Sequence, residues 1–379
     1  MPGPEPDKLW LSASPVCKTI GTLCTYIIVM IIPDERLIPL LGCRYPIIQA
    51  PMLGITSPEM VAAAIAAGAA GSLPVGGLSP ERTRELIRAT RKLTSAPFTV
   101  NLFTYDPPVA DPEGMAAMNL LLRSVCTRHG IPFEPASPGL FAYYSYKDQV
   151  QVLLDEKVSS ASFTFGIPDD ALIDALKRAG VCLTGTATAV DEAILLAEKD
   201  IDIIVVQGIE AGGHRGSFLA GPLPQVGLLP LLSQVLDRVS KPVVAAGGIY
   251  SGSQVKMLLQ YGAAGVQVGT ILVPAMESLA IPAYKEAVLK AKDVDSTLTR
   301  SFSGRWARGL RNTFMEEVDS SGLNIPAYPF QNYLTTAFRA AMQKENNKEW
   351  TNLWAGQSAG RSQPGTVQEI LAGLTSVLD

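Results

Sequence analysis

Residues 203–216 read IIVVQGIEAGGHRG and give the clearest indication of the architecture. The first five residues form a short apolar run rich in β-branched side chains, which is typical of a strand buried on both faces of a parallel sheet. This run passes directly into a glycine-rich loop that carries His214. Loops that follow parallel strands are common positions for catalytic residues, so the stretch predicts both a fold and a site.

Outward from this stretch, short apolar runs alternate with amphipathic stretches of helical period, which indicates repeated βαβ units. The predicted strands are residues 46–52, 71–76, 98–103, 158–165, 181–187, 202–207, 242–247 and 265–269. Eight parallel strands are what a closed (β/α)8 barrel, the TIM barrel, requires. An open doubly wound sheet usually has fewer strands and a GxGxxG turn after the first strand, where this chain has Met52-Leu53-Gly54.

Several helix boundaries can also be predicted. Ser57 and Ser79 are each followed by Pro and Glu, a pattern that reads as an N-cap, a proline at the first helical position and an acidic first turn. Gly68, Gly180 and Gly262 are placed to end helices just before the next strand.

The chain has 379 residues, whereas a typical barrel needs about 250. We predict an N-terminal extension of unknown role (1–33), the barrel (34–270), a helical substrate-binding lid region inserted after strand eight (271–362), and a C-terminal helix packing on the barrel (363–379). The connection at 104–157 should also hold more than one helix. Insertions after barrel strands lie over the active site, which makes 271–362 the candidate lid.

The N-terminal extension contains an apolar run at residues 20–32. The run is too short to cross a bilayer, which takes about 20 residues. It also begins late and lacks a small-residue cleavage site, which disfavours a secretory signal. We expect an extra buried or loosely packed segment; contact with a membrane surface, or removal of the segment from the mature chain, is less favoured.

Composition points to a small-molecule partner in a reducing compartment. The 31 Lys and Arg residues are scattered and the net charge is −4, so no nucleic-acid surface is predicted. The five cysteines lie far apart and form no CxxC pair, which argues against disulfides and against a zinc site. We therefore expect a cytoplasmic protein without a bound metal.

His214 is the predicted catalytic residue. The unperturbed pKa of histidine is about 6.5, so a histidine at a strand exit can act as a general base near working pH. Flanking glycines allow the backbone to approach a ligand closely. The alternative is a loop histidine satisfied by backbone carbonyls. His129, in the polar run RHG, is expected at the surface.

Two further motifs predict a phosphate site. Residues 245–249 (AAGGI) end strand seven, and residues 267–270 (QVGT) end strand eight. Their small side chains leave backbone N–H groups uncovered, and a helix expected near Ser251 points its N-terminus at the same place. A barrel's phosphate site is expected after these two strands. The alternative is that the glycines merely permit tight turns.

Polar side chains near three strand ends need hydrogen-bonding partners. They belong to Asn101, Gln207 and Gln267. A polar group in a barrel core is normally hydrogen-bonded, and the edge of an isoalloxazine ring offers alternating donors and acceptors to an amide. A purely structural polar network is the alternative.

Together these residues resemble the nitronate monooxygenase family, formerly called 2-nitropropane dioxygenases. The similarity spans residues 37 to about 360, and the motifs that carry it are GCRYPIIQAPM (42–52), EAGGHRG (210–216), AAGGI, QVGT, TRSFSGR (299–305), PAYP (326–329) and WAGQS (354–358). FMN-dependent enoyl reductases are similar at the EAGGH loop, whereas Arg215 and the later motifs favour the nitronate enzymes.

The resemblance implies an enzyme that uses FMN and molecular oxygen to oxidise nitronates or nitroalkanes. By this resemblance, His214 takes a proton from the carbon beside a nitro group or binds a nitronate already formed. The residues that would hold FMN are Met52, Asn101, Gln207, Gly212, Gly248, Gln267, Val268, Gly269 and Thr270. Two departures from the family pattern, the N-terminal extension and the bulky Trp306, leave the substrate open.

Three other functions stay open. A tailoring oxidoreductase of secondary-metabolite biosynthesis would use the same apparatus on an unknown substrate. An FMN-dependent enoyl-thioester reductase would need NAD(P)H to reduce its flavin. A flavin-binding protein without chemistry is disfavoured, because His214 stands beside intact phosphate turns.

Overall fold

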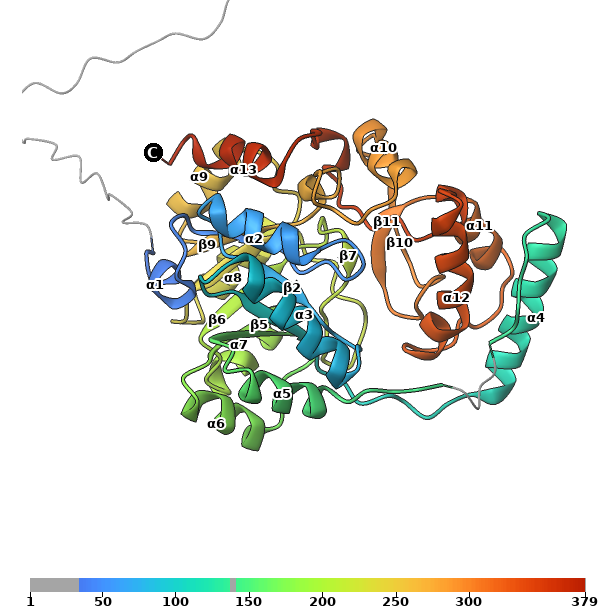
Figure 1. The fold of residues 1–379 in the computed structure, drawn as a ribbon, viewed down its shortest axis with the longest axis horizontal. Coiled ribbons are helices and arrows are strands. Elements are labelled where there is room, and N and C mark those ends of the chain that lie inside the picture. The colour runs from blue at the N-terminus through green and yellow to red at the C-terminus, as the bar shows by residue number, and fades with distance from the viewer. Residues whose placement is uncertain (1–33, 137–140, 379) are drawn as a thin grey trace, which may run out of the picture. The chain divides into compact units, whose positions relative to one another are not determined.

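The computed structural model describes residues 34–136 and 141–378 (Figure 1). Eight parallel strands form one sheet in the order β1-β9-β8-β6-β5-β4-β3-β2. Their bounds are β1 (Ile47–Gln49), β2 (Ser72–Pro74), β3 (Thr99–Phe103), β4 (Ser160–Thr164), β5 (Cys182–Ala187), β6 (Ile203–Gln207), β8 (Val243–Ala246) and β9 (Gly265–Val268). Each of the eight predicted strands overlaps one of these, so the predicted set is confirmed.

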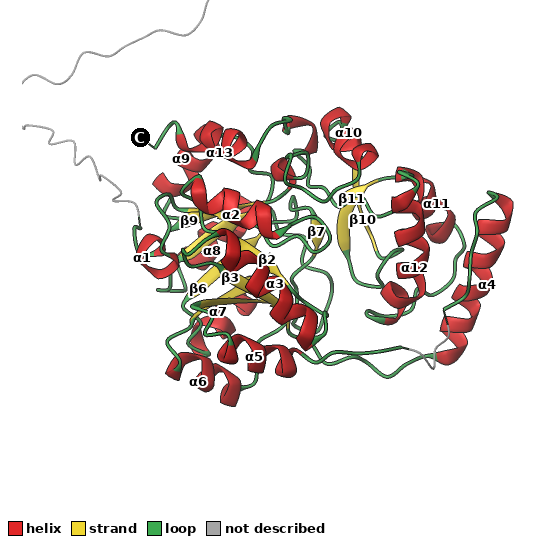
Figure 2. Cartoon of the chain, in the orientation of Figure 1, coloured by secondary structure: helices red, strands yellow, loops and turns green. Residues whose placement is uncertain are grey.

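The two edge strands of this sheet meet and close it. Ile48 of β1 forms a parallel bridge with Ala70, just before β2. The backbone amide of Ala70 donates to the carbonyl of Ile47 at 2.8 Å, and the side-chain oxygen of Gln49 accepts from the amide of Ser72 at 3.0 Å. The fold is therefore the (β/α)8 barrel that the sequence predicts, with helices outside the strands (Figure 2).

The barrel helices begin and end largely where the capping signals predict. They are α1 (Leu37–Leu41), α2 (Pro58–Ala66), α3 (Pro80–Leu93), α5 (Tyr146–Asp155), α6 (Asp170–Arg178), α7 (Val190–Glu198), α8 (Leu228–Leu236), α9 (Gly252–Gln260) and α13 (Val367–Thr375). The hydroxyls of Ser57 and Ser79 each accept a backbone N–H of the first turn. Gly68, Gly180 and Gly262 follow α2, α6 and α9 with positive φ, as expected for helix-terminating glycines.

Two insertions at the same end of the barrel build a second hydrophobic core. We call residues 112–128 and 296–354 the cap. It contains α4 (Pro112–Arg128), α11 (Thr313–Asp319) and α12 (Phe330–Lys344), and α4 lies beside α12 (Figure 1). Met118 of α4 is buried with Phe314 and Phe338 of the later helices. The segment that covers the barrel therefore draws on the connection at 104–157 as well as on the predicted lid.

The predicted lid region is not wholly helical. Besides α10 (Pro282–Lys290), it contains the strands β10 (Ser296–Thr299) and β11 (Ala307–Leu310), which pair antiparallel. β11 also pairs with the short strand β7 (Gly213–His214) in the loop after β6. This sheet is difficult to predict, because its strands are short and its β7–β11 pairing joins segments far apart in the chain.

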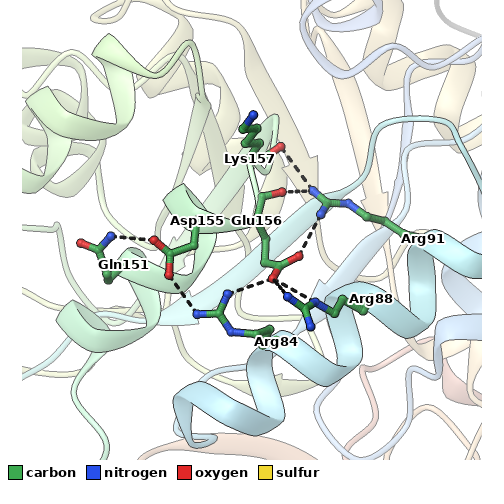
Figure 3. A network of polar contacts seen from close by, with 7 residues as sticks. All are labelled: Arg84, Arg88, Arg91, Gln151, Asp155, Glu156 and Lys157. Carbon is green, nitrogen blue, oxygen red and sulfur yellow. Dashed lines mark hydrogen bonds and ion pairs between the residues drawn. The ribbon is translucent and has the colours of Figure 1, made fainter.

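A cluster of ion pairs attaches the end of the connection at 104–157 to helix α3 of the barrel (Figure 3). Arg84, Arg88 and Arg91 of α3 all contact the carboxylate of Glu156, which directly follows α5. Burial opposes ionisation of this carboxyl group, but the hydrogen bonds from Arg88 and Arg84 outweigh it and lower the pKa of Glu156. These contacts thus fix the position of the chain shortly before β4 begins.

Some predictions concern segments with little or no structural description. The N-terminal extension, including its apolar run at 20–32, lies outside the described residues, as do Cys17 and Cys24. In the described part of the chain, Cys43, Cys126 and Cys182 are free thiols. No helix among those same residues has both the length and the apolar character needed to span a bilayer.

Candidate functional site

One cavity lies where the C-terminal ends of the barrel strands meet the cap. Its lining combines strand ends and the following turns of the barrel with side chains from α12 and from residues 352–358. Every site residue that the sequence predicts lines this cavity: Met52, Asn101, Gln207, Gly212, His214, Gly248, Gln267, Val268, Gly269 and Thr270. The fold therefore brings the whole predicted set together.

Side-chain hydrogen bonds of Arg215 and Glu210 fix the loop after β6. Arg215 is fully buried, and its guanidinium donates to the backbone oxygens of Gly208 at 2.6 Å and Gln207 at 2.9 Å. The carboxylate of Glu210 accepts the first backbone N–H of α8, at Leu228, at 3.0 Å. Such a carboxylate stabilises a helix N-terminus. The acidic and basic members of the EAGGHRG motif thus fix the loop that presents His214.

Gln207 supports the same loop with its side chain. Its Nε2 donates to the backbone oxygen of His214 at 3.0 Å, and its Oε1 accepts the backbone N–H of Gly216 at 2.9 Å. The nitrogen and the oxygen of this amide therefore both hydrogen-bond to backbone groups, one on each side of Arg215. Gln207 still lines the cavity, but its hydrogen bonds make it a positioning residue for His214.

The ring of His214 is packed among aromatic side chains. Ring centroids lie 5.3 Å away for Trp354, 5.8 Å for Phe165 and 6.1 Å for Tyr328. Its Nε2 lies 2.8 Å from the hydroxyl of Ser303. Burial, followed by the charges of two cap arginines, lowers the pKa of His214 to about 3. The ring is therefore neutral near pH 7, and its lone pair can accept a hydrogen bond; taking up a proton at that pH requires an anionic ligand that offsets the burial and the arginine charges.

The two cap arginines are Arg305 and Arg339. The Arg305 guanidinium lies 4.0 Å from the centroid of the Phe165 ring. Arg339 donates to the side-chain oxygens of Asn352 at 2.8 Å and Asn332 at 2.7 Å. Within the described part of the chain, both guanidinium groups hydrogen-bond only to neutral partners. Burial lowers the pKa of each to about 10, so both are charged at neutral pH.

Phe165 adopts an unusual backbone conformation at the end of β4. Its φ is 79°, in the left-handed region that bulky residues rarely adopt. The next residue is Gly166, and a side chain there would collide with the backbone oxygen of Thr104. This turn places the Phe165 ring between Arg305 and the ring of His214.

The turns after β8 and β9 form a surface of small residues. Gly248 has a φ of 68°, and its carbonyl accepts the hydroxyl of Ser358 at 2.9 Å. The hydroxyl of Thr270 accepts the backbone N–H of Gly356 at 3.0 Å. A Cβ on Gly212 would lie 2.5 Å from the nitrogen of Gly356. The segments at Gly212 and Gly356 can therefore approach this closely only because both residues are glycine.

The polar residues near the strand ends have spare hydrogen-bonding capacity. The Nδ2 of Asn101 donates to the hydroxyls of Ser162 at 3.0 Å and Thr164 at 3.2 Å. Among the described residues its Oδ1 has no partner, and neither does the side-chain amide of Gln267. Both side chains line the cavity, so these groups are available to a ligand.

Sequence reasoning assigned no role to several residues that shape the site. Ser303, Arg305, Tyr328 and Trp354 all lie within motifs of the family resemblance, which is the signal that could have singled them out. Arg339 lies in no such motif. An arginine on an amphipathic helix is normally predicted to be exposed to solvent, whereas Arg339 lines the cavity.

The barrel, its glycine turns and the partly buried histidine define an enzyme of the class that binds a ligand at the C-terminal ends of its strands. Comparison with known proteins identifies the family: a model of the nitronate monooxygenase family matches residues 34–376. The chain therefore belongs to the nitronate monooxygenase family and is an oxidoreductase.

Individual relatives agree with this assignment. A probable nitronate monooxygenase of Staphylococcus aureus (strain JH9) is 39% identical over 347 residues, covering 91% of this chain and 97% of the relative. A nitroalkane oxidase from Streptomyces ansochromogenes is similar in structure, with a TM-score of 0.82, 33% identity and coverage of 90% and 96%. FabK from Thermotoga maritima gives a TM-score of 0.71, 26% identity and coverage of 90% and 95%.

Proposed function

We propose that the protein is an FMN-dependent enzyme that oxidises nitronates, and the nitroalkanes from which they form, with molecular oxygen. One observation carries this proposal: a neutral histidine faces a cavity that has glycine turns on its barrel side and, on its cap side, a guanidinium group with no acidic partner among the described residues. The histidine suits a base, the glycine turns suit a phosphate group, and the guanidinium group suits an anionic substrate.

The residues present fit FMN. The turns at Gly248 and Gly269 line the cavity with backbone amides suited to one phosphate, and α9, which follows Gly248 closely, can add a favourable helix dipole. The free groups of Asn101 and Gln267 suit the polar edge of the ring system. The remaining wall would be formed by Met52, Gln207, Gly212, Val268 and Thr270. When bound, FMN would supply the redox chemistry that couples oxidation of the substrate to oxygen.

The chain's own residues supply proton handling and charge. A neutral His214 can take a proton from the carbon beside a nitro group, or hydrogen-bond to a nitronate that has already lost it. The positive charges of Arg305 and Arg339 favour the anion over the neutral nitro compound, because they act in a partly water-excluded site. Packing of Tyr328 and Trp354 around the His214 ring restricts the access of water to it.

The alternative with a specific observation behind it is an enoyl-thioester reductase. The EAGGH loop is shared with such enzymes by resemblance, and FabK is similar to this chain over nearly its whole length. A reductase would need NAD(P)H to reduce the flavin. A tailoring oxidoreductase of secondary metabolism would share the nitronate-type apparatus but act on another substrate.

One experiment separates these functions. The purified protein is heated, and the released flavin is identified by mass; FMN is expected, and FAD or no flavin after reconstitution with FMN contradicts the cofactor assignment. The flavin-loaded protein is then mixed anaerobically with propyl-2-nitronate or with NADPH. Rapid bleaching by the nitronate alone supports the proposal, whereas rapid bleaching by NADPH alone identifies a reductase.

A further inference from the structure

The cap places a serine hydroxyl against the candidate base. In the pairing of β7 with β11, His214 lies opposite Ala307. Ser303 precedes β11 in the same segment and is 1% exposed. Its Oγ lies 2.8 Å from Nε2 of His214. The contact therefore joins the loop after β6 to the cap through a buried side chain.

The other hydrogen bonds of Ser303 determine which group is the donor in its contact with His214. The backbone N–H of Arg305 donates to Oγ at 3.3 Å, and Oγ lies 3.2 Å from the carbonyl oxygen of Arg305. A carbonyl oxygen can only accept, and a serine hydroxyl has a single hydrogen to donate. When that hydrogen goes to the Arg305 carbonyl, Nε2 of His214 must donate to Oγ.

The opposite arrangement is less favourable. If the serine hydroxyl donated to Nε2, the carbonyl of Arg305 would have no donor among residues 34–136 and 141–378. Because this carbonyl lies in a part-buried contact, leaving it without a donor carries a free-energy penalty. The arrangement in which Ser303 donates to that carbonyl satisfies all three groups.

We propose that Ser303 is a positioning residue that holds His214 as the tautomer protonated on Nε2, so that Nδ1 carries the lone pair. Among the described residues Nδ1 has no hydrogen-bond partner, and the ring lines the cavity. The consequence for catalysis rests on the proposed function: a proton taken from the substrate carbon goes to Nδ1, which gives the imidazolium, while Nε2 stays anchored to the cap.

The tautomer can be observed without measuring activity, because the chain has only two histidines. The flavin-loaded protein, carrying no histidine tag, is labelled with ring-15N histidine, and proton–nitrogen correlation spectra are recorded. The signals of His129 are assigned with His129→Gln. We expect a bonded hydrogen on Nε2 of His214 and none on Nδ1. A hydrogen on Nδ1, or an equal mixture of the two tautomers, overturns the proposal.

Variants of Ser303 then test the cause. Ser303→Ala should let the His214 tautomers interconvert and should lower turnover of a neutral nitroalkane about 3- to 10-fold, the population factor that one ordinary hydrogen bond supports. Ser303→Thr keeps the hydroxyl and should keep the wild-type ring signals. Flavin content should be unchanged in both. An unchanged spectrum in Ser303→Ala overturns the proposal.

This design keeps the two proposals apart. A protein that oxidises no nitro compound would contradict the proposed function, yet the wild-type ring signals would still decide which nitrogen of His214 is protonated. Conversely, the nitronate reaction can proceed normally in a protein whose ring signals refute the role of Ser303. The wild-type spectrum also decides the question if Ser303→Ala fails to fold.

Discussion

The cavity has two unlike walls, one from the barrel and one from the cap. The barrel wall consists of glycine turns, backbone amides and neutral polar side chains such as Asn101 and Gln267. The cap contributes Arg339 directly to the lining, and it places Arg305 beside Phe165. The barrel wall is thus suited to hold a group by shape and backbone dipoles, whereas the cap wall sets the electric field around it.

The difference also has an energetic meaning. A buried cation without an acidic partner destabilises the folded protein, because its desolvation is not compensated. The lowered pKa values of Arg305 and Arg339, each about 10, reflect that penalty. This penalty is avoided at Glu156, where three arginines of α3 surround one carboxylate (Figure 3). Arg339 has no acidic partner among the described residues, and an anionic ligand in the cavity can supply one.

The largest expected effect comes from the barrel wall. Gly248→Val should abolish flavin binding and hence activity, since a β-branched side chain would cover the amides of the turn. Gly248 has a φ of 68°, so backbone strain must be controlled for. Gly180 has a φ of 75° and lies remote from the cavity, which makes Gly180→Val the matched control. Flavin content is measured by absorbance after gel filtration.

The outcome separates a cofactor site from a structural turn. Gly180→Val should lose stability to a similar extent but keep its flavin. A folded Gly248→Val protein with full flavin occupancy would show that this turn does not hold the phosphate group. Equal loss of flavin in both variants would trace the effect to backbone strain alone.

The next effect in size concerns the base between the two walls. His214→Asn should lower turnover of a neutral nitroalkane about 10²- to 10⁴-fold, the usual contribution of general base catalysis. The loss on a pre-formed nitronate should be smaller, because that substrate has already released its proton. Steady-state rates on both substrates and the flavin content are compared. Equal losses on both substrates, with flavin still bound, would refute the role of base.

The barrel wall was the more predictable of the two. Its strands follow from apolar runs and its turns from glycines at fixed places, so local sequence indicated both the fold and the position of residues such as Gly248 and Gln267. The caps at Ser57 and Ser79 were equally readable, because their hydrogen bonds connect residues close together in the chain. Predictions of this kind need no knowledge of long-range packing.

The cap was less predictable for physical reasons. The contact between His214 and Ser303 joins residues 89 positions apart through a sheet whose strands carry weak sequence signals. Arg339 is partly buried and donates to Asn332 and Asn352, a placement that no local pattern reveals. Phe165 lines the cavity through a left-handed backbone that its side chain disfavours. Family motifs indicated part of this region, but they did not show which atoms meet.

A smaller effect should follow from removing one cap charge. Arg339→Met should raise KM for an anionic nitronate about 10-fold, within the range for loss of a charged hydrogen bond. Arg300→Met is the matched control, because Arg300 belongs to the cap and hydrogen-bonds to the backbone oxygens of Gly304 and Ile325, but does not line the cavity. Both variants should keep their flavin. An unchanged KM in Arg339→Met would mean that the cap charge does not act on the substrate.

The smallest effect should appear in the dependence of stability on pH. The pKa of His214 is lowered by burial to about 3, below the value of about 6.5 expected in the unfolded chain. Unfolding therefore takes up a proton below pH 6.5, and the stability that the neutral ring contributes above that pH is lost as the pH falls towards 3. The loss should reach at most about 1.4 kcal/mol per pH unit. His214→Asn lacks this group, so its free energy of unfolding in urea should fall less steeply between pH 6.5 and 4.5. Parallel curves for the two proteins would contradict the lowered pKa of His214 and show that the two walls do not hold its ring neutral.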